Sequence, residues 1–314
     1  MNSIELQEIN RFANFELLAK QVVEGFITGL HRSPFHGFSV EFAEHRQYNT
    51  GESTRYIDWK LYARTEKLFI KRFEEETNLR CHILIDSSSS MYFPTDSDRP
   101  PGLRNKISFS ALASAALIEL MRRQRDAFGL SAFSDIIDFH TPDKSSVVHQ
   151  KYLYHHLELL SDDKLSIKKK KSDTAHLLHQ IAEMIHRRSL VVIFSDMFQP
   201  SAEESSSLDD IFSALQHMLH NRHEILLFHV TDKKHEIQFD FDDRPHRFID
   251  LESGEEIKLH PAEIRQSYRK AISQFENELR LKCAQHRIGF VEADINEGFD
   301  NVLWNFLVKR SKQF

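Results

Sequence analysis

The chain has 314 residues, of which 40% are hydrophobic and 28% are charged, with a formal net charge of -6 at pH 7. These values are ordinary for a globular protein of one large domain with appendages, or of two domains. The acidic balance argues against a general nucleic-acid binder.

Three further features indicate where the protein works. The first ten residues are polar and acidic, unlike a signal peptide, and the longest apolar stretch, residues 107–121, contains three serines and a glutamate. Cys81 and Cys283 are far apart in the sequence and form no Cys-x-x-Cys motif, which favours two buried free thiols in a reducing compartment. We therefore expect a cytoplasmic protein with no membrane span.

Residues 1–78 are expected to form an α+β extension that packs on the main sheet. Apolar residues recur at steps of three and four over residues 5–29, which predicts an amphipathic helix. Turn residues follow, and then a strand over residues 38–42, a helix over 54–64 and a strand over 68–73.

Residues 79–314 are expected to form one α/β domain. Apolar runs predict strands at residues 79–85, 128–133, 190–194, 224–230 and 288–292. Helical patterns alternate with these runs at residues 107–125, 152–160, 174–188, 208–220, 261–286 and 298–310. This alternation predicts a mostly parallel central sheet flanked by helices, with a β-hairpin excursion at residues 237–259.

Oxygen-bearing side chains follow two of the predicted strands. Asp86, Ser88 and Ser90 come at the end of the first strand, and Asp196 follows the strand at residues 190–194. Thr174 stands just before a predicted helix, and the carboxyl edge of a parallel sheet could bring all five together. Two carboxylates and three hydroxyls suit Mg²⁺ or Mn²⁺. An alternative without a metal is that Asp86 and the serines form a capped turn, and that Thr174 is a helix N-cap.

The sequence Asp86-Ser87-Ser88-Ser89-Ser90, followed by Thr174 and Asp196, resembles the metal-ion-dependent adhesion site of von Willebrand factor A domains. In that family the corresponding residues bind magnesium at the top of a Rossmann-like sheet. The resemblance implies the same fold here, a magnesium site made by these five residues, and a coordination position left open for a carboxylate from a partner.

Signatures in the first part of the chain narrow the resemblance to the bacterial family known as domain of unknown function 58. They are Gly29-Leu30-His31-Arg32-Ser33-Pro34, Phe42, Arg46-Gln47-Tyr48, Gly51-Glu52, Arg55-Tyr56-Ile57-Asp58-Trp59-Lys60, Ala63-Arg64-Thr65 and Phe73-Glu74-Glu75-Glu76. Two positions depart from the family pattern. Glu52 replaces an aspartate, and Ser172-Asp173 replaces a glycine pair before Thr174, where glycines would let the backbone approach the ion.

The resemblance implies a non-enzymatic module for metal-dependent protein–protein interaction. The family's genes often accompany AAA+ ATPases of the MoxR group, so the resemblance implies that the partner is such an ATPase or its client, supplying an acidic residue to the metal. An alternative is an Mg²⁺-dependent phosphoester hydrolase with Asp86 as nucleophile, although Ser88 stands where such enzymes usually carry a second aspartate. A scaffold with a degenerate site is a third reading.

Other conspicuous groups have simpler interpretations. We expect Trp59 to pack the first segment onto the sheet rather than to form an interface. Residues 168–171 are four lysines, either a solvated loop or a guide for an acidic partner. His217, His220 and His223 cannot all face one ion on a helix, and His176 and His179 suit zinc better than magnesium.

Overall fold

The computed structural model describes residues 44–47, 59–72, 79–95, 104–161, 174–198 and 208–297, together with residues 17, 20 and 23. The predicted strand at residues 38–42, the lysines at 168–171, the Ser172-Asp173 departure and the closing helix at 298–310 lie outside these residues, as does most of the predicted first helix. The chain divides into two compact units, one of which is Phe35–Leu79, while the other contains Arg80–Phe314.

The smaller unit contains a two-stranded antiparallel sheet and one short helix. Strand β1 (Glu44–Gln47) pairs with β2 (Phe69–Arg72), and helix α2 (Trp59–Thr65) lies between them in sequence. Within this unit Trp59 meets Tyr62 edge to face at 6.1 Å, and its packing onto the main sheet stays a prediction.

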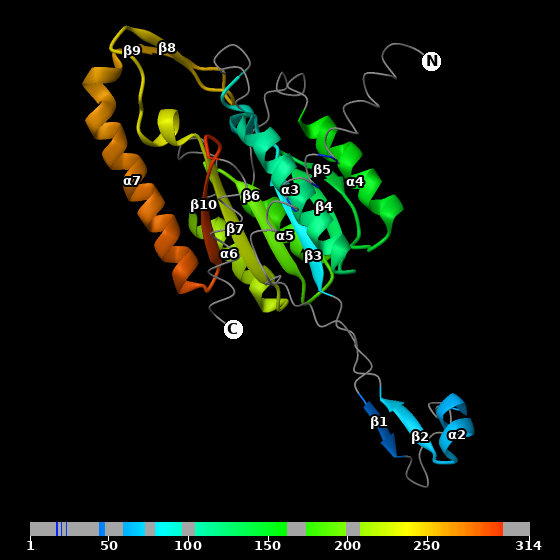
Figure 1. Cartoon of the computed structure of the whole chain (residues 1–314). Helices are drawn as coiled ribbons and strands as arrows, with labels where there is room; N and C mark the ends of the chain where they lie inside the picture. The colour runs from blue at the N-terminus through cyan, green and yellow to red at the C-terminus, as the bar shows by residue number, and fades with distance from the viewer. Residues whose placement is uncertain are drawn as a thin grey trace, which may run out of the picture. The chain divides into compact units, whose positions relative to one another are not determined.

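The larger unit is built on a six-stranded sheet that is parallel except at one edge (Figure 1). Its strand order is β10-β7-β6-β3-β4-β5. The five parallel strands are β3 (Arg80–Asp86), β4 (Ala127–Phe133), β6 (Leu190–Ser195), β7 (Glu224–Thr231) and β10 (Gly289–Asp294). Sequence reasoning missed β5 (Ile137–His140), which pairs antiparallel with β4.

Helices cover both faces of this sheet, as the alternating pattern predicts. One core cluster joins α5 (Thr174–Met184) and α6 (Leu208–His220) to inward-facing residues of β3, β6 and β7, such as Leu84, Ile193 and Leu227. Side chains alternate along a strand, so neighbours such as Ile83 and Ile85 face the other side, where α3 (Lys106–Arg123) packs with α4 (Val147–Leu160). No described helix has both the length and the apolar character needed to cross a membrane.

Local residue chemistry explains where the helices begin. The Asn105 side chain accepts a hydrogen bond from the Ser108 amide at 2.9 Å, which caps α3. The Ser146 hydroxyl accepts one from the His149 amide at 3.2 Å, and α4 therefore starts earlier than its apolar pattern suggested. Pro261 occupies the first turn of α7 (Pro261–Gln285).

Between β7 and α7 the chain leaves the sheet. A single π-helical turn, η4 (Lys233–Ile237), follows β7 and is capped by the Asp232 carboxylate. Strands β8 (His246–Ile249) and β9 (Glu256–Leu259) then form an antiparallel hairpin inside the range where the sequence predicts one. Figure 1 shows this hairpin near one end of α7, apart from the six-stranded sheet.

Candidate metal centre

The candidate site lies where the order of the strands reverses. From β3 the chain runs outward through β4 and β5, and it returns to the other side of β3 as β6. Ile85 of β3 pairs with Phe194 of β6, so Asp86, the last residue of β3, and Asp196, the first residue after β6, lie at almost the same level. Ligands of open α/β sheets bind at such a switch point, beyond the carboxyl ends of the strands.

Hydrogen bonds hold four of the five predicted ligands together. The Asp86 carboxylate accepts from the Ser88 amide at 2.9 Å and from the Ser195 hydroxyl at 2.7 Å. The hydroxyl oxygens of Ser88 and Ser90 are 3.1 Å apart, and the Ser90 side chain hydrogen-bonds to Asp196. The turn after β3 therefore places its two serine hydroxyls between the two carboxylates.

Thr174 is the fifth predicted ligand. It is buried and is the first residue of α5, the helix that leads into β6. In a parallel α/β unit such a helix runs opposite to the strands, so its first residue lies at the carboxyl edge of the sheet. Thr174 therefore lies at the same edge of the sheet as the other four predicted ligands. Its place at the start of α5 also fits the alternative, in which Thr174 serves the helix terminus rather than a metal ion.

A buried lysine that sequence reasoning missed contacts this site. Lys106, the first residue of α3, is 0% exposed, and its Nζ lies 2.7 Å from Asp196 Oδ2 and 2.5 Å from Glu236 Oε1. Glu236 comes from η4, and its other carboxylate oxygen accepts the Asp232 amide at 2.7 Å. The sequence does show a lysine at the start of a buried helix rich in alanine and leucine. Its two carboxylate partners lie 90 and 130 residues away in the chain, so local pattern does not reveal the ion pairs.

The electrostatics of the two aspartates differ. Burial, and then the charge of Asp196, raise the pKa of Asp86 to about 6. Burial would also raise the pKa of Asp196, but the Lys106 ammonium outweighs it and holds that pKa below its usual value. Burial lowers the pKa of His229 to about 4, so this ring is neutral near pH 7, and its Nε2–H donates to the Asp196 carbonyl at 3.0 Å.

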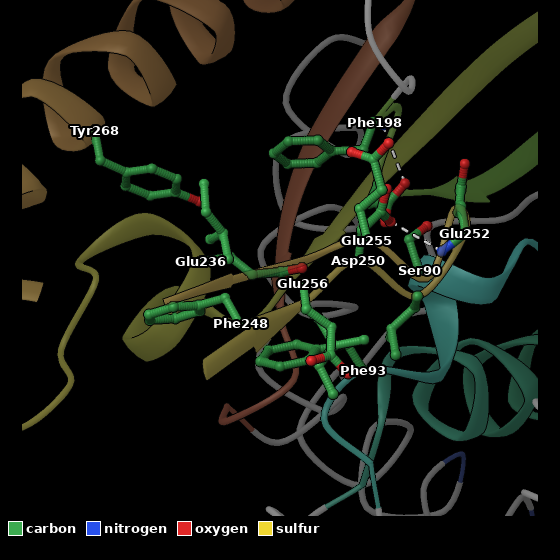
Figure 2. A pocket seen from close by; sticks show the side chains of 14 residues that line it. Ser90, Phe93, Phe198, Glu236, Phe248, Asp250, Glu252, Glu255, Glu256 and Tyr268 are labelled. Carbon is green, nitrogen blue, oxygen red and sulfur yellow. Dashed lines mark hydrogen bonds between the residues drawn. The ribbon is translucent and has the colours of Figure 1, made fainter. Parts of the chain in front are cut away.

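A third buried carboxylate lies near the aspartates. Glu252 lies in the turn between β8 and β9, is 6% exposed, and its buried Oε2 makes no hydrogen bond to any residue that the structure describes. Burial, then the charges of Asp196 and Asp86, raise its pKa to about 7. Glu252, Ser90 and Asp196 all line a cavity of about 610 Å³ beside the strand ends (Figure 2), which we call the hairpin cavity.

These groups fit a hard divalent cation in chemistry and in charge. Hydroxyl and carboxylate oxygens are the donors that Mg²⁺ prefers, and Mg²⁺ retains several waters. Burial, and then the charge of Asp196, raise the pKa values of Asp86 and Glu252, and a cation would favour the ionised form of both carboxylates. The described residues contain no group of three or more His, Cys, Asp and Glu side chains close enough to share one metal ion. A cation here would therefore rely on two carboxylates, on hydroxyls and on water.

A second polar network, inside the sheet, has the connectivity of a Ser–His–Asp triad. His82 Nδ1 lies 2.6 Å from Asp143 Oδ1, and His82 Nε2 lies 2.8 Å from Ser131 Oγ. Ser131 is 0% exposed, and its oxygen also lies 2.8 Å from Nδ1 of His140. A hydroxyl that is fully buried and shared by two imidazoles cannot attack a substrate, so this network is structural.

Comparison with known proteins gives distant matches. The uncharacterised proteins Mb1516 of Mycobacterium bovis and Rv1480 of Mycobacterium tuberculosis are each 23% identical over 185 residues, or 59% of this chain. The chain spans 56% of the length of these relatives.

Among solved structures, two from Bacteroides match the fold weakly. The conserved hypothetical protein BatB from Bacteroides thetaiotaomicron is 14% identical with a TM-score of 0.42, covering 74% of this chain and 99% of its own. An aerotolerance-related membrane protein from Bacteroides fragilis is 13% identical with a TM-score of 0.43, covering 75% and 100%. A family model, by contrast, matches residues 44–278, most of the chain, and the protein therefore belongs to the family described as protein of unknown function DUF58.

Proposed function

We propose that this protein is a metal-dependent protein–protein interaction module of the von Willebrand factor A type, whose strand-end site binds Mg²⁺ or Mn²⁺. Its partner would be a MoxR-group AAA+ ATPase or a client of that ATPase. The observation that carries the proposal is the meeting of Asp86, Ser88, Ser90 and Asp196 at the switch point of the sheet. Burial and the charge of Asp196 disfavour the ionised forms of Asp86 and Glu252 at the same place, and a cation would relieve this, which supports the proposal.

The chain's own residues divide the work of holding a cation. The hydroxyls of Ser88 and Ser90 and the carboxylates of Asp86 and Asp196 would bind it, with Thr174 as a further hydroxyl from α5. Ser195 and the Ser88 amide fix the orientation of the Asp86 carboxylate before any cation arrives. When bound, the cation would supply positive charge for an acidic side chain of the partner.

Lys106 has a separate role in this proposal. Its ammonium occupies one oxygen of Asp196 and holds the buried carboxylates together, so the site can fold without a cation. The same charge competes with a divalent ion for Asp196. Metal affinity is therefore expected to be modest, and partner binding to depend on the free Mg²⁺ concentration.

Isothermal titration with Mn²⁺ tests the metal site, and capture of the purified MoxR-group ATPase tests the partner. Asp86→Ala should abolish the heat of Mn²⁺ binding and the capture together, and EDTA should do the same to the unaltered chain. Asp138→Asn is a matched control, because this exposed carboxylate accepts hydrogen bonds from Ser87 and Ser134 beside the site. Capture that persists in EDTA and in Asp86→Ala would refute the proposal.

The alternative of phosphoester hydrolysis makes a different demand on Asp86. A nucleophilic carboxylate needs a free oxygen facing the substrate, whereas both oxygens of Asp86 accept hydrogen bonds. Release of p-nitrophenol from its phosphate ester in Mg²⁺, absent from Asp86→Asn, would favour the hydrolase over the interaction module.

A further inference from the structure

The hairpin cavity, lined by the β8–β9 hairpin and by residues of the loops after β3 and β6, η4 and α7, offers a second binding site beside the proposed metal centre. It holds about 610 Å³, enough for a large side chain with its neighbours on a peptide. Tyr268, from α7, and Phe93, from the loop after β3, approach it from different sides (Figure 2).

The carboxylates around this cavity are not all paired. Asp196 and Glu236 share the ammonium of Lys106, which is fully buried. Glu252 is at least nine-tenths buried, and its Oε2 has no hydrogen-bond partner within the described part of the chain. A buried polar group of this kind is costly unless a ligand completes it, and a cationic ligand would complete it best.

Two other acidic side chains of the hairpin, Asp250 and Glu256, are committed within it, while Glu255 also lines the cavity but is exposed to solvent. The Asp250 carboxylate accepts the Glu252 amide at 2.9 Å and the Ser253 hydroxyl at 2.6 Å. Glu256 lies 3.4 Å from Arg247 across the hairpin. These contacts fix the turn that presents Glu252, and Glu252 itself remains available.

Aromatic rings form much of the remaining wall. Phe93, Phe198, Phe248 and Tyr268 all line the cavity. Ring faces attract cations, most strongly where water is excluded, and the attraction is about 0.5–2 kcal/mol in general. Aromatic walls around an unpaired carboxylate therefore favour a cation with a flat or aliphatic body over a small hydrated ion.

The rim of the cavity is apolar and exposed. Ile249 is 47% exposed, Ile257 59% and Phe198 37%, and all three line the cavity. Exposed apolar side chains around a polar anchor are typical of protein interfaces. The occupant thus has a charged centre and apolar neighbours, as a side chain on a polypeptide does.

We propose that the hairpin cavity binds an arginine side chain of a partner protein, with the guanidinium at Glu252 and its stem against the aromatic wall. Arginine fits better than lysine because its planar group can stack on rings and bind a carboxylate through two parallel hydrogen bonds. The site adds a second contact to the partner of the proposed function. The arginine site depends on the proposed function only in that the partner is a protein, because arginine binding in the hairpin cavity needs no metal.

The test uses two amino acids whose termini are blocked and therefore uncharged, N-acetyl-arginine N-methylamide and the matching citrulline compound. The citrulline side chain has nearly the same shape as that of arginine but carries no charge. Amide chemical shifts of the full chain are followed in EDTA, so that metal binding plays no part. The arginine probe should shift residues of the hairpin turn and α7, and the citrulline probe should bind at least about tenfold more weakly.

Two variants assign the effect to one carboxylate. Glu252→Gln should weaken the arginine probe by about fivefold or more, whereas Glu263→Gln, an exposed glutamate in the first turn of α7, should change nothing. Equal binding of the two probes, shifts outside the cavity, or an unchanged affinity in Glu252→Gln would each overturn the proposal. Loss of Mn²⁺ binding in Asp86→Ala with the arginine effect intact would support both sites separately.

Discussion

Replacing Asp86 by asparagine should stabilise the metal-free protein while abolishing its proposed metal site. Asp86 is 2% exposed, and burial and the nearby Asp196 raise its pKa from 3.8 to about 6. Because the folded-state pKa lies above the unfolded value, folding favours the protonated carboxyl. The contribution of this group to stability is complete below pH 3.8 and is lost as the pH rises through about 6.

The size of the effect follows from the shift. A rise of about two pKa units corresponds to about 3 kcal/mol of lost stability once Asp86 is ionised, at 1.36 kcal/mol per unit. Asparagine keeps the oxygen that accepts the Ser88 amide, and loss of the charge-assisted bond from the Ser195 hydroxyl is already contained in this shift, because the protonated carboxyl lacks it too. The net gain is therefore about 3 kcal/mol, or roughly 6–12 °C in Tm for a domain of this size.

Thermal unfolding over a range of pH, with EDTA or with Mg²⁺, measures both effects. In EDTA, Asp86→Asn should unfold at a higher temperature than the unaltered chain above the folded-state pKa of about 6, and at the same temperature below pH 3.8. Mg²⁺ should raise the Tm of the unaltered chain and leave the variant unchanged. A variant that is less stable than the unaltered chain in EDTA at high pH would refute the reasoning that the fold disfavours the ionised form of Asp86.

Three further substitutions test other buried groups. Lys106→Met should cost about 3–5 kcal/mol in urea unfolding near neutral pH, because Asp196 keeps its buried charge and loses its ammonium partner; a cost below about 1 kcal/mol would contradict the ion pair. Glu119→Gln should cost about 3 kcal/mol, since bonds from two arginines and Gln150 outweigh burial and lower the pKa of Glu119 from 4.5 to about 2. This loss should be seen above pH 4.5 and fade as the pH falls towards 2. Gly129→Ala should cost about 1–3 kcal/mol, because the new Cβ would lie 2.3 Å from the carboxylate that pairs with His82, and the double change with His82→Ala should cost less than the sum.

The sequence was sufficient for those parts of the fold and site that depend on local pattern. Strand ends can be read from apolar runs, and carboxyl ends of parallel strands share an edge, so Asp86 and Asp196 could be placed together without coordinates. The short antiparallel strand β5 was missed because its four residues carry too little pattern to separate a strand from a loop. The π-helical turn η4 was missed for a similar reason, since it is one turn long.

The missed members of the site are those whose partners are distant in the chain. Lys106 reads as an ordinary first-turn residue of a helix until η4 folds back and brings Glu236 to its ammonium. Glu252 reads as a solvated turn residue, since Asp250-Leu251-Glu252-Ser253-Gly254 is typical of an exposed hairpin loop. Only the position of the hairpin beside the strand ends makes that glutamate a buried charge.

Lys106, Glu236 and Glu252 change the balance of charge at the candidate site. Asp196 and Glu236 share the single ammonium of Lys106, while the buried carboxylates of Asp86 and Glu252 lie within reach of the charge of Asp196, so the described part of the site holds more carboxylates than ammonium groups. An apolar or amide residue at Asp86 or Glu252 would be more stable, and sites that retain such strain are usually those that bind a ligand. Two cationic ligands would relieve it at different points, a divalent ion between Asp86 and Asp196 and a guanidinium at Glu252. A partner that presents an acidic residue to the first and an arginine to the second would match the site in both signs of charge, whereas a purely acidic or purely basic partner would match only half of it.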